Sequence, residues 1–432
     1  MSDTADQHPR AYGQEPSGPV PGPDSEPEPD SEPEPEPEPE PVSEDERRRR
    51  RRERRRRAAR GARRVLARSS PQSTIRQRLA LLDAAGEVYD LDESVDAYGD
   101  GVVAALEAEV ARLLGKEAAA FFPTGTMAQQ VALRCWAGRT GNPAVALHGK
   151  AHPEVHERAA FSQVSGLRPV RLTDEPRQPT AEEVRDCEEP FGALMLELPL
   201  RDAGHLLPSW QELTELVEAA RERDAVVHFD GARLWESAVH LGRPLDEIAG
   251  LADSVYVSFY KSLDGFGGAA LAGPGTLVEE ARTWRHRYGG LVFQQFPTAL
   301  AALLGLEREL PRLPSYVRHA RVVAAALAEG FAAAGLPWSR VHPEVPHTNE
   351  FQVWLPYDAD VVAEAAIRTA EETGTLLFAH AWDAPVPGLA VTEVDVRAAG
   401  LEWSAGDVRT AVADFVARLG REDGAARERA DG

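Results

Sequence analysis

An aspartate and a lysine stand at the ends of two predicted strands, and together they suit the chemistry of one cofactor. Asp230 follows an apolar run over residues 226–229, and Lys261 follows a second apolar run over residues 254–259. In open α/β sheets, ligands bind at the carboxyl ends of the strands. A lysine amine condenses with the aldehyde of pyridoxal phosphate, and a carboxylate keeps the pyridine nitrogen protonated. The plainer alternative is that Asp230 caps a helix and Lys261 is a solvated surface amine.

A loop of threonine and glycine offers a site for the phosphate group of such a cofactor. Residues 118–122 read as a short strand, PTGT follows at residues 123–126, and residues 127–136 read as a helix. Free N–H groups at a helix N-terminus can bind an anion, and the hydroxyls of Thr124 and Thr126 can assist them. Taken alone the motif is weak, because Thr and Gly also cap helices for structural reasons.

His152 is a candidate for stacking on the flat ring of a cofactor. It opens the stretch HPEVHE, in which His156 follows four residues later. Two histidines at that spacing could bind a metal on one face of a helix. However, the glutamate is not placed as in HExxH and no third ligand is evident, so we expect no metal site. An ordinary buried histidine is the alternative.

The order of the predicted elements indicates an α/β fold with a second, smaller domain. Strands alternate with helices from about residue 118 to 272, which favours a mainly parallel sheet built of βαβ units. Ser209 and Glu212 form a capping-box sequence at the start of one of these helices. After residue 273 the pattern changes to helices at 299–310, 316–334 and 361–373, with a strand at 351–355. We therefore expect a large domain over residues 70–312 and a small α+β domain over residues 313–420.

Both chain ends read as unstructured. Residues 1–42 are rich in Pro and Glu and cannot bury enough apolar area to offset the entropy of ordering. Residues 47–57 are arginine except for Glu53, and residues 421–432 are charged. We expect a disordered tail over residues 1–69 and a frayed end over residues 421–432. The arginine run could tether RNA or another anionic surface, or it could fold back on the acidic body or the acidic tail, and we favour the second interpretation.

The composition excludes several classes of protein. Residues 1–64 hold 14 of the 48 basic and 16 of the 70 acidic residues, so the body carries a net charge of −20, which argues against general nucleic-acid binding by the body. Two cysteines are too few for a disulfide framework. No apolar run approaches the length of a membrane span and no secretory signal is visible, so we expect a soluble cytoplasmic protein.

Several motifs resemble, in order, those of the threonine aldolase / β-eliminating lyase family, whose members are pyridoxal-phosphate enzymes of fold type I. The likeness covers roughly residues 85–400. The matching stretches are YGDG at 98–101, LLGKEAAAFFPTGTMA at 113–128, AHPEVHE at 151–157, HFDGARLWESAVHLG at 228–242 and DSVYVSFYKSLDGFGGAALAG at 253–273. DGAR followed about thirty residues later by the lysine segment is the most specific part.

The resemblance implies a role for each matching residue. Lys261 would bind the cofactor covalently, Asp230 would pair with the pyridine nitrogen, and His152 would stack on the ring and act in proton transfer. Gly125 and Thr126, with Thr124, would hold the phosphate. Arg233 would lie beside the cofactor or the substrate carboxylate, and Tyr98 would lie near the substrate. The family is oligomeric, which implies a homodimer or homotetramer, with active sites at subunit interfaces. Its members cleave β-hydroxy-α-amino acids to glycine and an aldehyde.

The substrate-binding motifs depart from the family pattern. The N-terminal RSDT segment has no counterpart, the ENTH segment reads ELPL at 197–200, and GGGMRQ reads GGLVFQ at 289–294. The RLVTH segment, whose arginine grips the substrate carboxylate, reads LAVTE at 389–393, and Tyr260 precedes Lys261 where serine is usual. Losing one charge-assisted contact costs about 1.5–3 kcal/mol of binding. Arg201 and Arg282 are candidates for a replacement.

Three functions remain open from the sequence. The first is a pyridoxal-phosphate lyase that cleaves Cα–Cβ or eliminates at Cβ, with altered recognition of the substrate carboxylate. The second is an aminotransferase or α-oxoamine-type enzyme on the same fold, since a fold does not dictate a reaction. The third is a non-catalytic cofactor-binding scaffold whose tail makes the interactions.

Overall fold

The structure is a computed structural model that describes residues 43–66, 73–336 and 338–431, so the predicted disorder of residues 1–42 lies outside the described residues. The chain divides into two units, residues 1–48 and 49–432. In the first unit, the described residues form the beginning of one helix. Apart from the bounds and composition of that helix, everything below concerns the second unit.

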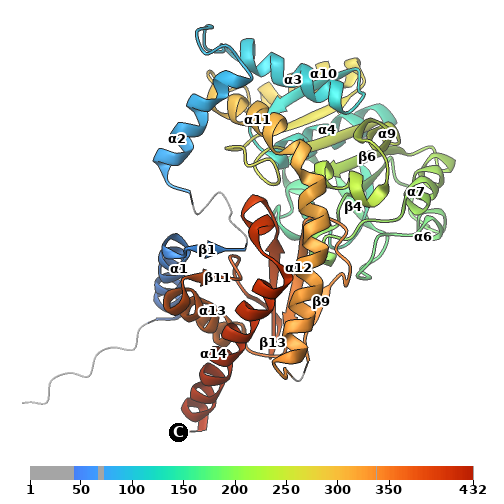
Figure 1. The fold of residues 1–432 in the computed structure, drawn as a ribbon. Helices are drawn as coiled ribbons and strands as arrows, with labels where there is room; N and C mark the ends of the chain where they lie inside the picture. Colours follow the sequence, from blue (N-terminus) through green and yellow to red (C-terminus); the bar gives the residue numbers. More distant parts are fainter. Residues whose placement is uncertain (1–42, 67–72, 337, 432) are drawn as a thin grey trace, which may run out of the picture. The chain divides into compact units, whose positions relative to one another are not determined.

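Seven described strands form the larger sheet, in the order β2-β8-β7-β6-β5-β3-β4 (Figure 1). The pairs β3–β4, β3–β5, β5–β6 and β6–β7 are parallel, whereas β8 runs antiparallel to both of its neighbours. The mainly parallel sheet is therefore confirmed. The bounds are β2 Ala118–Phe122, β3 Ala144–Leu147, β4 Arg168–Arg171, β5 Ala193–Glu197, β6 Val226–Gly231, β7 Ser254–Ser258 and β8 Ala269–Gly273.

Helices cover both faces of this sheet, because side chains alternate between the faces along each strand. In β2, Ala119 and Phe121 join one core, which α3, α7 and α11 complete. Ala120 and Phe122 join the opposite core, which is completed by α4 and α10. The helix bounds are α2 Ile75–Asp83, α3 Gly101–Leu113, α4 Gly125–Thr140, α5 His152–Val155, α6 Ala181–Arg185, α7 Trp210–Glu222, α8 Ala238–Leu241, α9 Leu245–Gly250, α10 Gly275–Arg287 and α11 Phe296–Arg308.

Around Asp230, the structure differs from the predicted elements in two details. Strand β6 continues to Gly231, so Asp230 lies inside the strand rather than after it. The predicted helix over residues 234–241 is split into a 3-10 turn at Leu234–Glu236 and the short helix α8. The turn is tied to the sheet, because the indole N–H of Trp235 donates to the carbonyl of Ser258 at 2.9 Å. By contrast, the capping box at Ser209 is present at the start of α7, as predicted.

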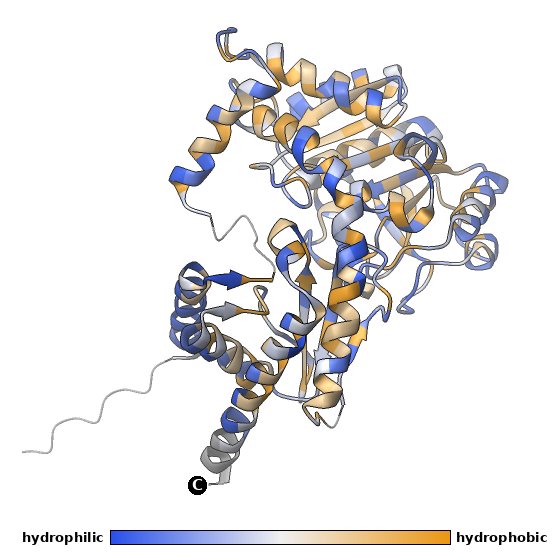
Figure 2. Cartoon of the chain, in the orientation of Figure 1, coloured by the Kyte–Doolittle hydropathy of each residue, from blue (hydrophilic) through white to orange (hydrophobic). Residues whose placement is uncertain are grey.

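The smaller sheet is antiparallel, in the order β12-β13-β10-β9, and packs with α12, α13 and α14 around its own core. Figure 2 shows apolar and polar residues alternating along these helices, and their buried apolar residues belong to this core. The bounds are α12 Leu313–Ala333, β9 Arg340–His342, β10 Glu350–Leu355, α13 Ala359–Thr373, β11 Thr375–Leu376, β12 Asp383–Val386, β13 Leu389–Asp395 and α14 Ala405–Asp431. The exact boundary between the large and small domains, placed at residues 312–313 from the sequence, stays a prediction.

The described residues at the two ends include regular elements, and the predicted bounds of the two unstructured tails stay predictions. Helix α1 spans Glu44–Gly61, and β1 (Arg64–Val65) pairs in parallel with β11. Ala58 and Ala62 are four residues apart and are buried in a small core with Ile367. The arginines around them make this short apolar pattern difficult to recognise in the sequence. At the other end, α14 continues to Asp431, and Arg418 binds Glu372 at 2.9 Å.

Within the described ranges, no helix combines the length and the apolar character needed to cross a bilayer.

Candidate active site

The carboxyl ends of β6 and β7 bring Asp230 and Lys261 to one cavity. Both strands are parallel neighbours in the sheet, so their ends meet at the same edge. The cavity is lined by Thr124, Gly125, Thr126, His152, Glu157, Asp230, Ala232, Tyr256, Tyr260 and Lys261. Six of the eight site residues predicted from the sequence are thus brought together, and Arg233 and Tyr98 are not among the lining residues.

Lys261 has the properties of a nucleophilic amine. Burial and the positive charge of Arg233 lower the pKa of Lys261 to about 8, against the opposing charge of Asp230. The ammonium form is thereby disfavoured, and a larger share of the side chain is a neutral amine at neutral pH. A neutral amine is the form that attacks an aldehyde.

Asp230 presents a buried carboxylate to the cavity. Its Oδ1 accepts the backbone N–H of Ala232 at 3.1 Å, and no hydrogen bond from another described residue reaches Oδ2. Burial raises the pKa of Asp230, and the positive charges of Lys261 and His152 oppose the rise. A buried carboxylate with one oxygen unengaged can hold a protonated ring nitrogen.

Glu197 at the end of β5 lies beside Asp230 in the sheet register and was not predicted as a site residue. Its Oε2 accepts the backbone N–H of His152 at 2.7 Å, and its Oε1 accepts that of Arg201 at 3.2 Å. Burial and the charge of Asp230 raise the pKa of Glu197. This side chain therefore fixes the two loops that carry His152 and Arg201.

The imidazole of His152 is oriented by a second carboxylate. Its Nδ1 lies 3.1 Å from Oε1 of Glu157, whose Oε2 accepts the side-chain amide of Gln130 at 3.2 Å. Burial lowers the pKa of His152, but the hydrogen bond to Glu157 and the charge of Asp230 outweigh it and raise the pKa above its usual value. With Nδ1–H donated to Glu157, the other ring nitrogen is a proton acceptor toward the cavity.

The N-terminus of α4 forms an anion cradle. Thr124 caps the helix, since its hydroxyl accepts the N–H of Met127 at 3.2 Å. The first N–H groups of a helix have no partner within it, and no backbone carbonyl elsewhere in the described chain accepts those of Gly125 and Thr126. A Cβ at position 125 would lie 2.0 Å from the hydroxyl of Tyr256, so only glycine allows this approach.

These features fit pyridoxal phosphate. The cradle supplies unpaired donors for a phosphate, Asp230 supplies an oxygen for the ring nitrogen, and Lys261 supplies the amine. Each of the three is a requirement of that cofactor's chemistry. All three lie on the walls of one cavity.

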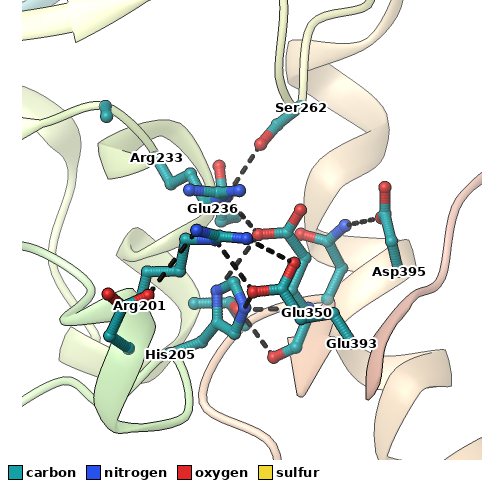
Figure 3. A network of polar contacts seen from close by, with 12 residues as sticks. Arg201, His205, Arg233, Glu236, Ser262, Glu350, Glu393 and Asp395 are labelled. Carbon is teal, nitrogen blue, oxygen red and sulfur yellow. Dashed lines mark hydrogen bonds and ion pairs between the residues drawn. The ribbon is translucent and has the colours of Figure 1, made fainter. Parts of the chain in front are cut away.

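Beside this cavity, side chains of the large domain face carboxylates of the small sheet (Figure 3). Glu350, at the start of β10, contacts Nε of Arg233 and lies 3.1 Å from Nδ1 of His205. Glu393, in β13, binds Arg201 through two contacts of 2.8 and 3.0 Å, and it lies 3.3 Å from Nε2 of His205. The same strand carries Asp395, which pairs with Arg397 at 2.6 Å.

The polar network of Arg201, His205, Arg233, Glu350 and Glu393 sets the protonation of its own members. Burial opposes the ionisation of Glu350, but the charges of Arg233 and His205 outweigh it and hold the pKa of Glu350 well below its usual range. Burial alone would lower the pKa of His205, yet Glu350 and Glu393 raise it to about 9. Two arginines and one protonated histidine therefore face the carboxylates of Glu350 and Glu393 at neutral pH, and Asp202 adds a third carboxylate 3.5 Å from Arg201.

The two arginines that could replace the family's carboxylate-binding arginine lie in different places. Arg201 belongs to the network, whereas Arg282 binds Glu107 at 2.6 Å and the carbonyl of Ala119 at 3.0 Å. Tyr98 is exposed, and its ring packs on Phe293 at a centroid distance of 5.3 Å. The sequence analysis did not predict Glu350, Glu393 or His205 as site residues. Glu393, which stands where the family's RLVTH segment has histidine, was the one departure in the sequence that pointed to this network.

A mostly parallel sheet with an aspartate, a lysine and an anion cradle at one edge defines a pyridoxal-phosphate enzyme of fold type I. The chain belongs to the β-eliminating lyase family, whose model matches residues 70–354, and the predicted family is thereby confirmed. A low-specificity L-threonine aldolase of Arabidopsis thaliana is 28% identical over 299 residues, which are 67% of this chain and 81% of that protein.

Solved structures agree. A Listeria monocytogenes protein, described as a candidate L-allo-threonine aldolase, has a TM-score of 0.76 and 32% identity, covering 84% of this chain and 99% of that one. A serine palmitoyltransferase from S. paucimobilis with a bound pyridoxal phosphate–myriocin adduct has a TM-score of 0.60, covering 84% of this chain and 88% of that one. At 19% identity, the second likeness concerns the fold alone.

Proposed function

We propose that the chain is a pyridoxal-phosphate-dependent lyase of the threonine aldolase type, which cleaves the Cα–Cβ bond of a β-hydroxy-α-amino acid to glycine and an aldehyde. The observation that carries the proposal is the single cavity shared by Lys261, Asp230 and the N-terminus of α4. Similarity to proteins described as threonine aldolases supports this reaction over transamination. Elimination at Cβ is the nearest alternative within the same family.

The proposed roles follow from the geometry. When bound, pyridoxal phosphate supplies an electron sink for the bond that breaks. Asp230 keeps the ring nitrogen protonated, and the N–H groups of Gly125 and Thr126 hold the phosphate. His152 accepts the proton of the substrate's β-hydroxyl, because Glu157 fixes its ring and raises its pKa. Retro-aldol cleavage requires removal of that proton.

Arg233 is the proposed partner of the substrate carboxylate. Glu350 contacts Nε, and the two terminal nitrogens donate a hydrogen bond to no described residue. Two adjacent N–H donors match the two oxygens of a carboxylate. Amino-acid binding is therefore compatible with the loss of the family's second arginine.

Covalent attachment of the cofactor tests the proposal directly. The chain has three lysines, Lys116, Lys150 and Lys261, so borohydride reduction followed by peptide mass analysis has three possible outcomes. We expect a visible absorption band with added cofactor and a reduced adduct on Lys261, both absent in Lys261→Ala and present in Lys150→Ala. An adduct on Lys116 or Lys150 alone, or no band in the unaltered chain, would refute the cofactor assignment.

Product analysis then separates the reactions. Incubation of the holoenzyme with β-hydroxy amino acids should release glycine and an aldehyde in equal amounts. Conversion of the cofactor to its pyridoxamine form by amino donors would instead establish an aminotransferase, and cofactor binding without turnover would establish a scaffold.

Assembly and location stay predictions. Exposed apolar side chains gather on α2 and the nearby loops, among them Ile75 and Leu79, which supports a homodimer or homotetramer. Sedimentation of the holoenzyme would measure the oligomeric state. The cytoplasm is the expected compartment, and cell fractionation would test it.

A further inference from the structure

Helix α1 docks on the small domain through one face only. Arg54 binds Glu364 and Glu371 of α13 at 2.6 and 2.5 Å, and Arg51 contacts Asp360 of the same helix. Ala58 is buried on this side in the small core that includes Ile367. The predicted fold-back of the arginine run on the acidic body is therefore confirmed for this face.

The opposite face of α1 presents arginines that nothing in the described chain neutralises. Arg52, Arg56 and Arg60 are exposed, and no ion pair or hydrogen bond joins their guanidinium groups to another described residue. Residues four apart lie on one side of a helix, about 6 Å apart along its axis, so the three form a continuous stripe. Burial and the charges of Arg52 and Arg56 lower the pKa of the neighbouring Arg55, which reflects this uncompensated charge.

The arginine side chains of the stripe indicate what kind of partner it can bind. Arginine presents a fork of N–H donors that binds phosphate oxygens bidentately. The helix has eleven arginines and no aromatic or large apolar side chain, and its alanines Ala58 and Ala59 already pack against the small core that includes Ile367. Helices that bind membranes insert an apolar face, and α1 has none left to insert. A regularly spaced polyanion fits these features better than a bilayer.

We propose that the outward stripe of α1, Arg52, Arg56 and Arg60, binds the phosphodiester backbone of a nucleic acid. This function is separate from the active site, and it does not depend on the proposed lyase activity. The body carries a net charge of −20, so contact is confined to the helix and should be weak and sensitive to salt. Backbone contacts carry no sequence information, so the binding is independent of base sequence.

The test compares two charge-matched variants of the full chain. One variant carries Arg52→Gln, Arg56→Gln and Arg60→Gln, and the control carries Arg51→Gln, Arg54→Gln and Arg64→Gln, whose arginines bind carboxylates of the body. Fluorescence anisotropy with a labelled oligouridylate and a labelled DNA duplex, each about 20 nucleotides long, would measure affinity between about 20 and 200 mM KCl.

We expect the unaltered chain to bind both probes, with affinity falling steeply as salt rises. Loss of three phosphate contacts should reduce the slope of log K against log [KCl] by about 2 for the single strand. The outward variant should show this change and the control should keep the original slope. Absence of binding at the lowest salt, equal losses in both variants, or binding to phosphatidylserine vesicles without binding to either nucleic acid would each overturn the proposal. Unchanged circular dichroism and cofactor spectra would confirm that the outward variant is folded.

Discussion

Glu350 contacts Arg233 at Nε, and the two terminal nitrogens of the same guanidinium donate a hydrogen bond to no described residue. The carboxylate therefore orients the arginine and also cancels its charge. A substrate carboxylate that binds the free fork would have Glu350 as a negative neighbour, and like charges brought together disfavour binding.

Replacing Glu350 by Gln separates these two effects. The amide oxygen can keep the polar contact with Nε of Arg233, while the competing negative charge is gone. We expect KM for a β-hydroxy amino acid to fall about tenfold, which corresponds to about 1.4 kcal/mol, with kcat changed less. Glu344→Gln, at an exposed position outside the network, is the control. A KM that rises in Glu350→Gln would show that orientation, rather than charge, is the main contribution.

Changing His152 to Phe should keep the cofactor and slow turnover. The phenyl ring retains a flat surface, but it cannot accept the β-hydroxyl proton. Loss of a general base costs about 10² to 10⁴ in rate, and the pH dependence of kcat that reports this histidine should disappear. His286→Phe, at an exposed position, is the matched control. Equal turnover in both variants would remove His152 from the reaction.

Stability should fall with rising pH because of His205. Its pKa in the folded chain is about 9, above the ordinary value of 6.5, so the protonated form is stabilised by folding. That contribution is complete below pH 6.5 and is lost as pH rises toward 9. Denaturant unfolding should show a decline in the free energy of unfolding of up to about 3 kcal/mol over this window. The decline should be smaller in His205→Gln, and identical pH profiles would contradict the assignment.

Two glycines of α4 should respond oppositely to alanine. A Cβ at Gly125 would lie 2.0 Å from the hydroxyl of Tyr256, whereas a Cβ at Gly138 meets nothing within 4 Å. We expect Gly125→Ala to destabilise the chain by about 1–3 kcal/mol and to weaken cofactor binding. Gly138→Ala should stabilise it by about 0.5–1 kcal/mol, because alanine loses less entropy in a helix. Thermal unfolding and cofactor titration measure both effects, and a neutral Gly125→Ala would mean that the cradle is more open than described.

The part of the site that sequence reasoning found consists of residues at strand ends and at a helix start. Asp230, Lys261 and Gly125 each lie in a short segment whose pattern fixes the local structure, and the parallel sheet then brings the segments together. The family resemblance supplied the roles.

The part that it missed depends on contacts between distant segments. Glu350 and Glu393 lie on β10 and β13, which are adjacent antiparallel strands of the small sheet. Glu350 contacts Arg233, and Glu393 contacts Arg201. In the sequence, Glu393 is recognisable only as a departure from the family's RLVTH segment. Only the contact between the small sheet and the turn that follows β5 shows that the acid binds an arginine instead.

The docking of α1 makes the arginine-rich arm a structural part of the small domain. Strand β1 covers β11, and Ala58, Ala62 and Val65 shield Ile367 and Leu376 from water. A chain shortened to begin at Ser70 would leave a bare strand edge beside an apolar patch, a combination that promotes self-association. Recombinant production should therefore retain the arm, and affinity tags are better placed before residue 43 than in place of the helix.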